Sequence, residues 1–186
     1  LQQPGSGDLE RLRRDLGRDI RVAARLAAAD IAFHPKRGNL VHEPEAVATQ
    51  DGRPYSVYSP FRRAWERLER RPVLPAPTAL AGTDLDPGVI SDLAPGAADP
   101  SELDPAFLPA PGETAARGRL AAWLDRRIDD YAASRDRLDL ADGTSRLSAD
   151  LHLGLLSPNE VVERALGPGD GRRVFVNELA WREFYA

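Results

Sequence analysis

Two short segments of the 186-residue chain carry the side chains best suited to chemistry. The first, 143–148, reads Gly-Thr-Ser-Arg-Leu-Ser and places three hydroxyls and one guanidinium within five residues, just before a leucine-rich run. Hydroxyls and free backbone N–H groups at the start of a helix can bind a phosphate or diphosphate. Ordinary helix capping by Thr144 or Ser145 explains the same residues without a ligand.

The second segment, 177–185, reads Asn-Glu-Leu-Ala-Trp-Arg-Glu-Phe-Tyr. Four of its side chains are spaced i, i+3, i+4 and i+7, so a helix would place them on one face: Glu178, Trp181, Arg182 and Tyr185. A carboxylate, an indole and a guanidinium on one face can bind a planar polar ligand by stacking and bidentate hydrogen bonding. The simpler alternative is a solvated Glu178–Arg182 pair, contributing about 0.3–0.5 kcal/mol, beside a half-buried Trp181.

Helices must position these segments, and the apolar spacing predicts several of them. Residues 8–30 have the 3–4 spacing of an amphipathic helix, and a second such helix is predicted from Glu113 to about Arg135. The apolar stripe of the second is Ala116, Leu120, Leu124, Ile128 and Tyr131. Residues 157–160, Ser-Pro-Asn-Glu, predict a helix start with a capping box, and Gly-Pro at 167–168 predicts its end. A final helix is predicted to begin near Arg172.

The remaining segments are less regular. The apolar pieces at 31–34 and 39–42 are predicted to be strand-like or extended, as the remainder of one α/β unit. Residues 72–112 contain nine of the 16 prolines, four glycines, six acidic residues and neither Lys nor Arg. Such a composition predicts an extended connector, because proline cannot continue a helix and the segment offers little to bury.

Composition excludes several classes of protein. The chain has no cysteine, which excludes a disulfide scaffold, a zinc–thiolate site and a cysteine nucleophile. Its three histidines are far apart in sequence, so no metal site is predicted. No apolar run approaches the roughly 18 residues of a membrane span, which predicts a soluble, cytoplasmic protein without membrane contact. The formal net charge of −4 gives no overall sign of nucleic-acid binding.

A local basic cluster is the one feature that could face DNA. It consists of Arg62, Arg63, Arg67, Arg70 and Arg71. Glu66 and Glu69 interleave with these arginines, and this alternation favours a salt-bridged, solvated helix over a DNA-binding patch.

The two chemical segments, with the residues between and before them, resemble the DNA photolyase/cryptochrome family, in particular the class I cyclobutane pyrimidine dimer photolyases. The similarity lies in the order of four motifs: Gly-Thr-Ser-Arg-Leu-Ser, Leu-His-Leu-Gly at 151–154, Ser-Pro at 157–158, and Asn-Glu-Leu-x-Trp-Arg-Glu-Phe-Tyr. Upstream, 51–61 resembles the end of the family's α/β domain and 111–113 the opening of its helical flavin domain. The resemblance covers about residues 18–186.

One motif departs from the family. Relatives usually have Ser-Pro-Tyr-Leu-His-Phe-Gly where 148–154 here reads Ser-Ala-Asp-Leu-His-Leu-Gly. The main differences are Asp150 and Leu153, and they weaken an assignment to any particular subfamily.

The resemblance implies a mainly α fold with a partial α/β remnant. Residues 1–62 would be the end of a Rossmann-like antenna domain, 63–112 an interdomain linker, and 113–186 the beginning of an all-α FAD-binding domain. The chain would then be a fragment with about half of a flavin site. In the complete protein a folate or deazaflavin antenna chromophore could bind to the part of the α/β domain that precedes this segment.

The resemblance also implies a role for individual residues. FAD would contact Tyr131, Thr144, Ser145, Arg146, Leu147, Ser148 and Arg182. Glu178 and Trp181 would be the catalytic, lesion-binding pair. The implied protein is a monomeric deoxyribodipyrimidine photo-lyase that splits pyrimidine dimers in damaged DNA by electron transfer from reduced FAD, although the fragment alone would be inactive. The alternatives are a cryptochrome-type blue-light photoreceptor without repair activity and an inactive truncated remnant.

Overall fold

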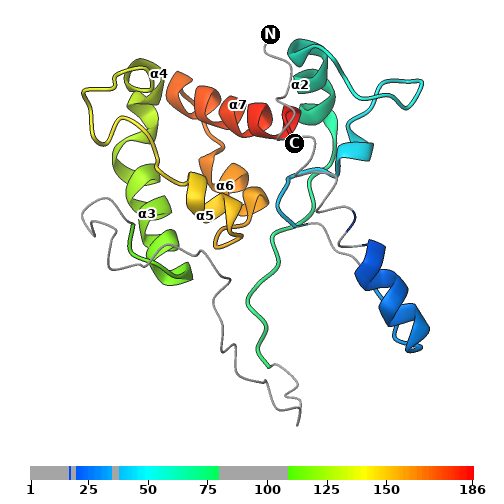
Figure 1. The fold of residues 1–186 in the computed structure, drawn as a ribbon. Helices are drawn as coiled ribbons and strands as arrows, with labels where there is room; N and C mark the ends of the chain where they lie inside the picture. Colours follow the sequence, from blue (N-terminus) through cyan, green and yellow to red (C-terminus); the bar gives the residue numbers. More distant parts are fainter. Residues whose placement is uncertain (1–16, 18–19, 35–37, 80–108) are drawn as a thin grey trace. The chain divides into compact units, whose positions relative to one another are not determined.

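The computed structural model of the protein describes residues 17, 20–34, 38–79 and 109–186 (Figure 1). The chain divides into two units, 1–37 and 38–186. In the first unit, 20–28 are helical, as the apolar spacing predicts, and the predicted helix start at Asp8 lies outside the described residues.

The second unit is built from helices. In chain order they are η1 (Pro44–Ala46), α2 (Tyr58–Arg67), α3 (Glu113–Arg126), η4 (Ile128–Asp130), α4 (Tyr131–Ser134), α5 (Ser148–His152), α6 (Pro158–Ala165) and α7 (Asp170–Phe184). The longest of them are α3 and α7. α7 packs against α2, α4, η4 and α6 (Figure 1), whereas α3 packs against η4 and α6. A single core contains side chains from all of these α-helices.

The described part of the chain contains no strand, only an isolated bridge between Ala48 and Pro54. The expectation of strand-like pieces at 31–34 and 39–42 is therefore wrong as far as strands are concerned. Residues 31–34 are exposed and have no regular structure, whereas 39–42 form bends. The backbone N–H groups of Val41 and His42 donate to the carboxylate of Glu183. A side chain therefore provides the acceptors that a neighbouring strand would provide in a sheet.

The helix predicted from 113 to about 135 is broken. α3 ends at Arg126, the backbone of Arg127 leaves the helical region with φ −133°, and η4 and α4 follow. The break places the carbonyls of Ile128 and Asp129 against the start of α7, where a Cβ atom on Gly171 would lie only 2.1 and 2.3 Å from the two oxygens. Close packing of α7 therefore accounts for a break that the apolar stripe did not indicate.

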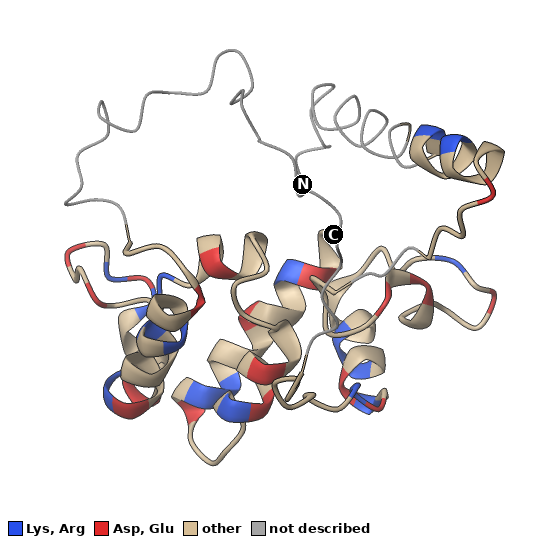
Figure 2. Cartoon of the chain, turned by 90° about the horizontal axis from the view of Figure 1, so that it is seen from below, with Lys and Arg blue, Asp and Glu red and all other residues tan. Residues whose placement is uncertain are grey.

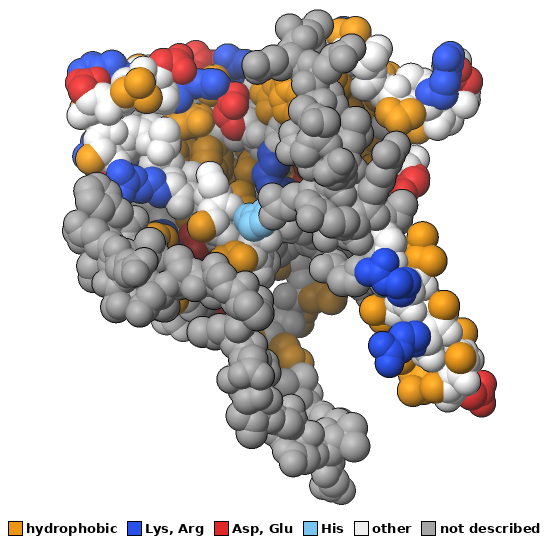
Figure 3. Space-filling view, in the orientation of Figure 1, with side chains coloured by type: hydrophobic (Ala, Val, Ile, Leu, Met, Phe, Trp, Pro, Cys, Tyr) orange, Lys and Arg blue, Asp and Glu red, His pale blue; other side chains and the backbone are white. Residues whose placement is uncertain are grey.

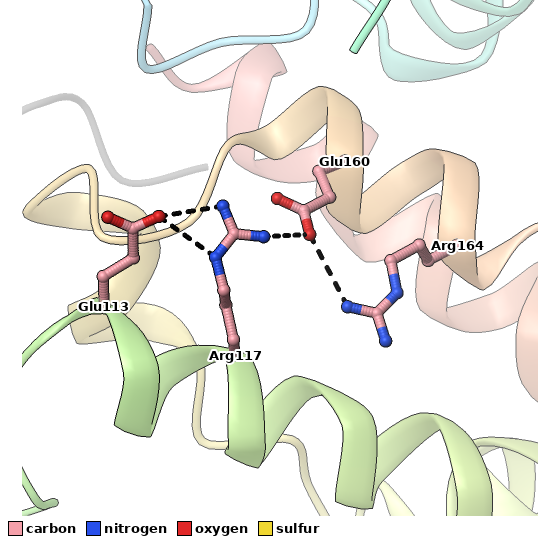
Figure 4. A network of polar contacts seen from close by, with 4 residues as sticks. All are labelled: Glu113, Arg117, Glu160 and Arg164. Carbon is pink, nitrogen blue, oxygen red and sulfur yellow. Dashed lines mark hydrogen bonds and ion pairs between the residues drawn. The ribbon is translucent and has the colours of Figure 1, made fainter. Parts of the chain in front are cut away.

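α6 begins and ends where the sequence predicts, but the predicted capping box does not form. Ser157 makes no side-chain capping bond. The buried Glu160 instead accepts from Nη1 of Arg117 at 2.7 Å and pairs with Arg164 at 3.5 Å. Arg117 also bonds Glu113, so the four side chains form a network that ties α3 to α6 (Figure 4).

The basic cluster is partly neutralised, as the alternating charges predict. Arg62 pairs with Glu66 at 2.8 Å along α2, and Arg71 donates to the Leu40 carbonyl at 2.9 Å. Figure 2 shows basic and acidic residues interleaved along the helices.

The connector is described only at its two ends. Residues 72–79 and 109–112 contain neither helix nor strand, and 80–108 lie outside the described residues. The division of the chain at 62 and 112 stays a prediction. No helix in the described part of the chain is long and apolar enough to cross a membrane.

A buried carboxylate on α7 joins three parts of the second unit. Glu183 accepts from Val41 N at 2.5 Å, from His42 N at 3.3 Å and from Trp65 Nε1 at 2.7 Å. Burial raises the pKa of Glu183, and the three donated hydrogen bonds act in the opposite direction. All three partners are donors, so both side-chain oxygens are needed as acceptors.

Glu183→Gln should therefore destabilise the fold by about 2–4 kcal/mol, since hydrogen bonds to charged groups contribute about 1.5–3 kcal/mol each. The amide NH₂ would face a donor and leave it without an acceptor. Urea unfolding followed by circular dichroism measures the effect. Glu66→Gln is the matched control, because it removes an exposed pair that contributes about 0–1 kcal/mol. Equal losses in the two variants would contradict the structural role of Glu183.

Candidate functional site

A hollow of about 760 Å³ lies between α4, the segment before α5, α5 itself and α7. Figure 3 shows apolar side chains in the depression on this face, with basic and acidic side chains beside it. The residues that line it are Tyr131, Thr144, Ser145, Arg146, Leu147, Ser148, Ala149, Leu151, His152, Phe175, Glu178, Leu179 and Arg182. Every residue predicted to contact a cofactor lies in this lining, together with Glu178.

The loop 143–147 has a defined conformation. Ser134 Oγ donates to the Gly143 carbonyl at 3.0 Å, and a Cβ at Gly143 would lie only 3.0 Å from the Ser134 carbonyl oxygen. Arg146 adopts a left-handed backbone with φ 54°, and the adjacent Leu147 is buried. The loop is thus fixed at both ends and presents exposed side chains of Thr144 and Arg146.

Helix capping does not account for this loop. The residue before α5 is Leu147, and α5 has no side-chain capping bond. The Oγ of Ser145 instead accepts from the N–H of Leu147 at 3.4 Å, within the loop. Neither Thr144 nor Ser145 caps α5, so the capping alternative is wrong, and Thr144 and Ser148 are exposed residues in the lining of the hollow.

The face of α7 divides into two parts. Glu178 and Arg182 line the hollow, whereas Trp181 and Tyr185 are not in its lining. Glu178 does not pair with Arg182. It accepts from Arg135 Nη1 at 2.5 Å, while Arg182 donates to the Asn39 carbonyl at 2.8 Å.

Arg135 is a residue of this site that the sequence did not assign. Its guanidinium lies 6.0 Å from the ring centroid of Tyr131 and pairs with the carboxylate of Glu178, so it joins two residues that line the hollow, one on α4 and one on α7. Burial, and then the negative charge of Glu178, raise the pKa of Tyr131, which keeps the phenol neutral. The sequence signal for Arg135 was its spacing, because it follows Tyr131 by four residues, about one helical turn. A similar spacing relates Phe175 to Glu178, which follows it by three residues.

Trp181 is half-buried on another side of α7. Its ring stacks on Tyr58 with centroids 3.5 Å apart and an interplanar angle of 8°. Tyr185 provides a second near-parallel ring at 5.6 Å and 16°. The indole of Trp181 therefore lies outside the hollow, in an aromatic cluster formed by residues of α7 and α2.

The departure at Asp150 has a clear structural role. This buried carboxylate receives two hydrogen bonds from Arg119, at 3.0 and 2.6 Å. The pair ties α5, which forms one wall of the hollow, to α3. Leu153, the other departure, is exposed and makes no contact that explains it.

A helical unit with a hollow lined by hydroxyls, arginines and aromatic rings suits a large ligand with both phosphate and planar groups. Comparison with known proteins identifies the class. The DNA photolyase family profile matches residues 9–79. The chain is 36% identical over 197 residues to a deoxyribodipyrimidine photo-lyase of Synechococcus, covering 96% of this chain and 39% of the relative. It is 40% identical over 148 residues to a deoxyribodipyrimidine photo-lyase of Thermus thermophilus, covering 78% and 32%.

A solved structure agrees. The bacterial class III photolyase from Agrobacterium tumefaciens matches with a TM-score of 0.66 and 28% identity over 90% of this chain and 36% of that one. The chain belongs to the DNA photolyase family, as its motifs predict. It spans about two fifths of the length of the Synechococcus relative. The class I assignment stays a prediction.

Proposed function

We propose that this chain is part of a light-dependent DNA repair flavoprotein, a monomeric cytoplasmic protein that splits pyrimidine dimers. The observation that carries the proposal is the hollow into which three separate segments bring Tyr131, Thr144–Ser148, Glu178 and Arg182. Family membership supports it, since relatives across this segment are named deoxyribodipyrimidine photo-lyase.

FAD fits the chemistry of this hollow. The volume of about 760 Å³ lies within the range of roughly 300–1,000 Å³ that small-molecule and cofactor sites occupy. Thr144, Arg146 and Ser148 offer donors for a diphosphate. Tyr131 and Phe175 offer aromatic walls. Once bound and reduced, the flavin would supply the electron chemistry, while the protein supplies binding, orientation and electrostatics.

The chain's own residues would hold the lesion next to the cofactor. A dimer must leave the duplex stack, at a cost of a few kcal/mol that is lower for damaged bases. Glu178, which Arg135 fixes at 2.5 Å, presents a carboxylate that can accept a hydrogen bond from a pyrimidine N–H. Trp181 offers an apolar ring on the same helix.

Flavin retention tests the cofactor assignment. The 186-residue chain, purified alone, should lose added FAD on desalting, because it spans only about two fifths of its photolyase relative and, by the family resemblance, would hold only part of the flavin site. The full-length product of the gene that carries this sequence should keep it. Stoichiometric flavin absorbance in the 186-residue chain would show that the hollow is already complete. Absence of flavin from the full-length product would refute the FAD site.

A further inference from the structure

We propose that Tyr58 is a positioning residue that holds the indole of Trp181 in place for a damaged base pair, an inference that rests on the proposed function. Tyr58 is the first residue of α2, and 122 residues of sequence, the connector included, separate it from Trp181 on α7. The two rings nonetheless lie in near-parallel contact, 3.5 Å apart at 8°. A residue from the part of the chain before the connector therefore covers one face of the indole.

The ring of Tyr58 is fixed by its own hydroxyl. This group lies 2.7 Å from Asn177 Oδ1 and 3.0 Å from the Asn177 carbonyl, and it can donate its proton to either. Asn177 precedes Trp181 by four residues, so the hydroxyl of Tyr58 contacts α7 about one helical turn before the residue on which its ring stacks. Burial raises the pKa of Tyr58 to about 12, so the hydroxyl remains a donor at neutral pH.

The other rings around Trp181 belong to its own helix or its end. Phe184 contacts it edge-on at 5.6 Å and 82°, and Tyr185 lies near-parallel at 5.6 Å. Tyr185 is 74% exposed, whereas Tyr58 is partly buried. Among the described residues, Tyr58 is the one aromatic side chain from another element that contacts the indole. Without it, the indole could adopt other rotamers.

Loss of this contact should appear mainly in lesion binding. A ring that is already ordered need not be immobilised when a base pair stacks on it, and ordering one large side chain costs affinity. Tyr58→Leu in the full-length product should lower affinity for dimer-containing DNA about three- to tenfold. Affinity for undamaged DNA, which depends on phosphate contacts, should stay within about twofold. Flavin content should not change, because Tyr58 is not in the hollow's lining.

Two further variants separate positioning from general stability. Tyr58→Phe keeps the ring and should restore most of the preference for damaged DNA. Tyr55→Leu is the matched control, since Tyr55 contacts Phe61 and not Trp181. If Tyr58→Leu fails to fold, Tyr58→Gln keeps a donor for Asn177 without a ring and replaces it. Unchanged damaged-DNA affinity in Tyr58→Leu, with Trp181→Ala impaired, would overturn the inference and leave the proposed function intact.

A second readout does not depend on repair. In the 186-residue chain Trp65 and Trp123 are buried, with exposures of 1% and 4%, so acrylamide quenching of fluorescence reports chiefly on Trp181. Tyr58→Leu should increase quenching, and Tyr58→Phe should not. Equal quenching in the wild type and Tyr58→Leu would show that Tyr58 does not hold the indole. If wild-type protein did not prefer damaged DNA, the proposed function would fail, and quenching would still decide the positioning of Trp181.

Discussion

Gly171→Ala should destabilise the protein by about 3 kcal/mol or more, at the upper end of what overpacking costs. An added Cβ would lie 2.1 Å from the Ile128 carbonyl oxygen and 2.3 Å from that of Asp129. Both obstacles are backbone atoms, so no side chain can rotate away, and the start of α7 would have to move. Urea unfolding followed by circular dichroism measures the change.

Gly118→Ala is the matched control for this prediction. Gly118 lies within α3, and a Cβ there would meet nothing within 4 Å. Alanine is favoured over glycine inside a helix by about 0.8–1 kcal/mol, so this variant should be slightly more stable than the wild type. The same chemical change should therefore have opposite effects in the two helices. A Gly171→Ala protein as stable as Gly118→Ala would contradict the close packing of α7 on η4.

Trp181→Ala in the full-length product should lower affinity for dimer-containing DNA by about ten- to a hundredfold, because stacking contributes about 1–3 kcal/mol per base. Binding to undamaged DNA should change much less, since phosphate contacts determine it. Bound flavin should be retained, because Trp181 is not in the lining of the hollow. Fluorescence anisotropy with damaged and undamaged duplexes measures both affinities.

Arg182→Ala, on the same helix, should affect flavin binding, which Trp181→Ala should leave unchanged. Arg182 lines the hollow and donates to the Asn39 carbonyl at 2.8 Å, so its loss should reduce flavin retention after desalting. Comparison of the two variants separates lesion binding from cofactor binding. If Trp181→Ala bound damaged DNA as tightly as the wild type and repaired it in light, Trp181 would have no role in the lesion site.

Local patterns predicted the helices well, because an apolar stripe and a proline near a helix start act over a few residues. α6 begins at Pro158, and the end of α7 contains all of the predicted 177–185 segment except Tyr185, which lies just beyond the helix. The same local patterns predicted the wrong partners for two glutamates, because each pairs with an arginine that is distant in sequence. Glu160 binds Arg117 and not the start of its own helix, and Glu178 binds Arg135 and not Arg182. In each case the arginine lies 43 residues earlier in the chain.

The spacing on α7 was only partly informative about the site. It placed Glu178, Trp181 and Arg182 on one face, but about 100° around the helix axis separates Trp181 from Arg182. This angle is enough for Arg182 to line the hollow while Trp181 stacks on Tyr58. Membership of the hollow was predictable from the family motifs, whereas the pairing with Tyr58 depends on α2, a distant element that no local pattern relates to α7.

Light-dependent removal of dimers is the most direct test of the proposed repair activity. Full-length product is incubated with dimer-containing DNA under reducing conditions, in blue light and in darkness, and the remaining dimers are counted. The proposed function predicts that dimers disappear in light, persist in darkness, and persist in light with Trp181→Ala at DNA concentrations well below its weakened Kd. A protein that retains flavin but leaves the number of dimers unchanged in light would contradict repair and favour the photoreceptor alternative.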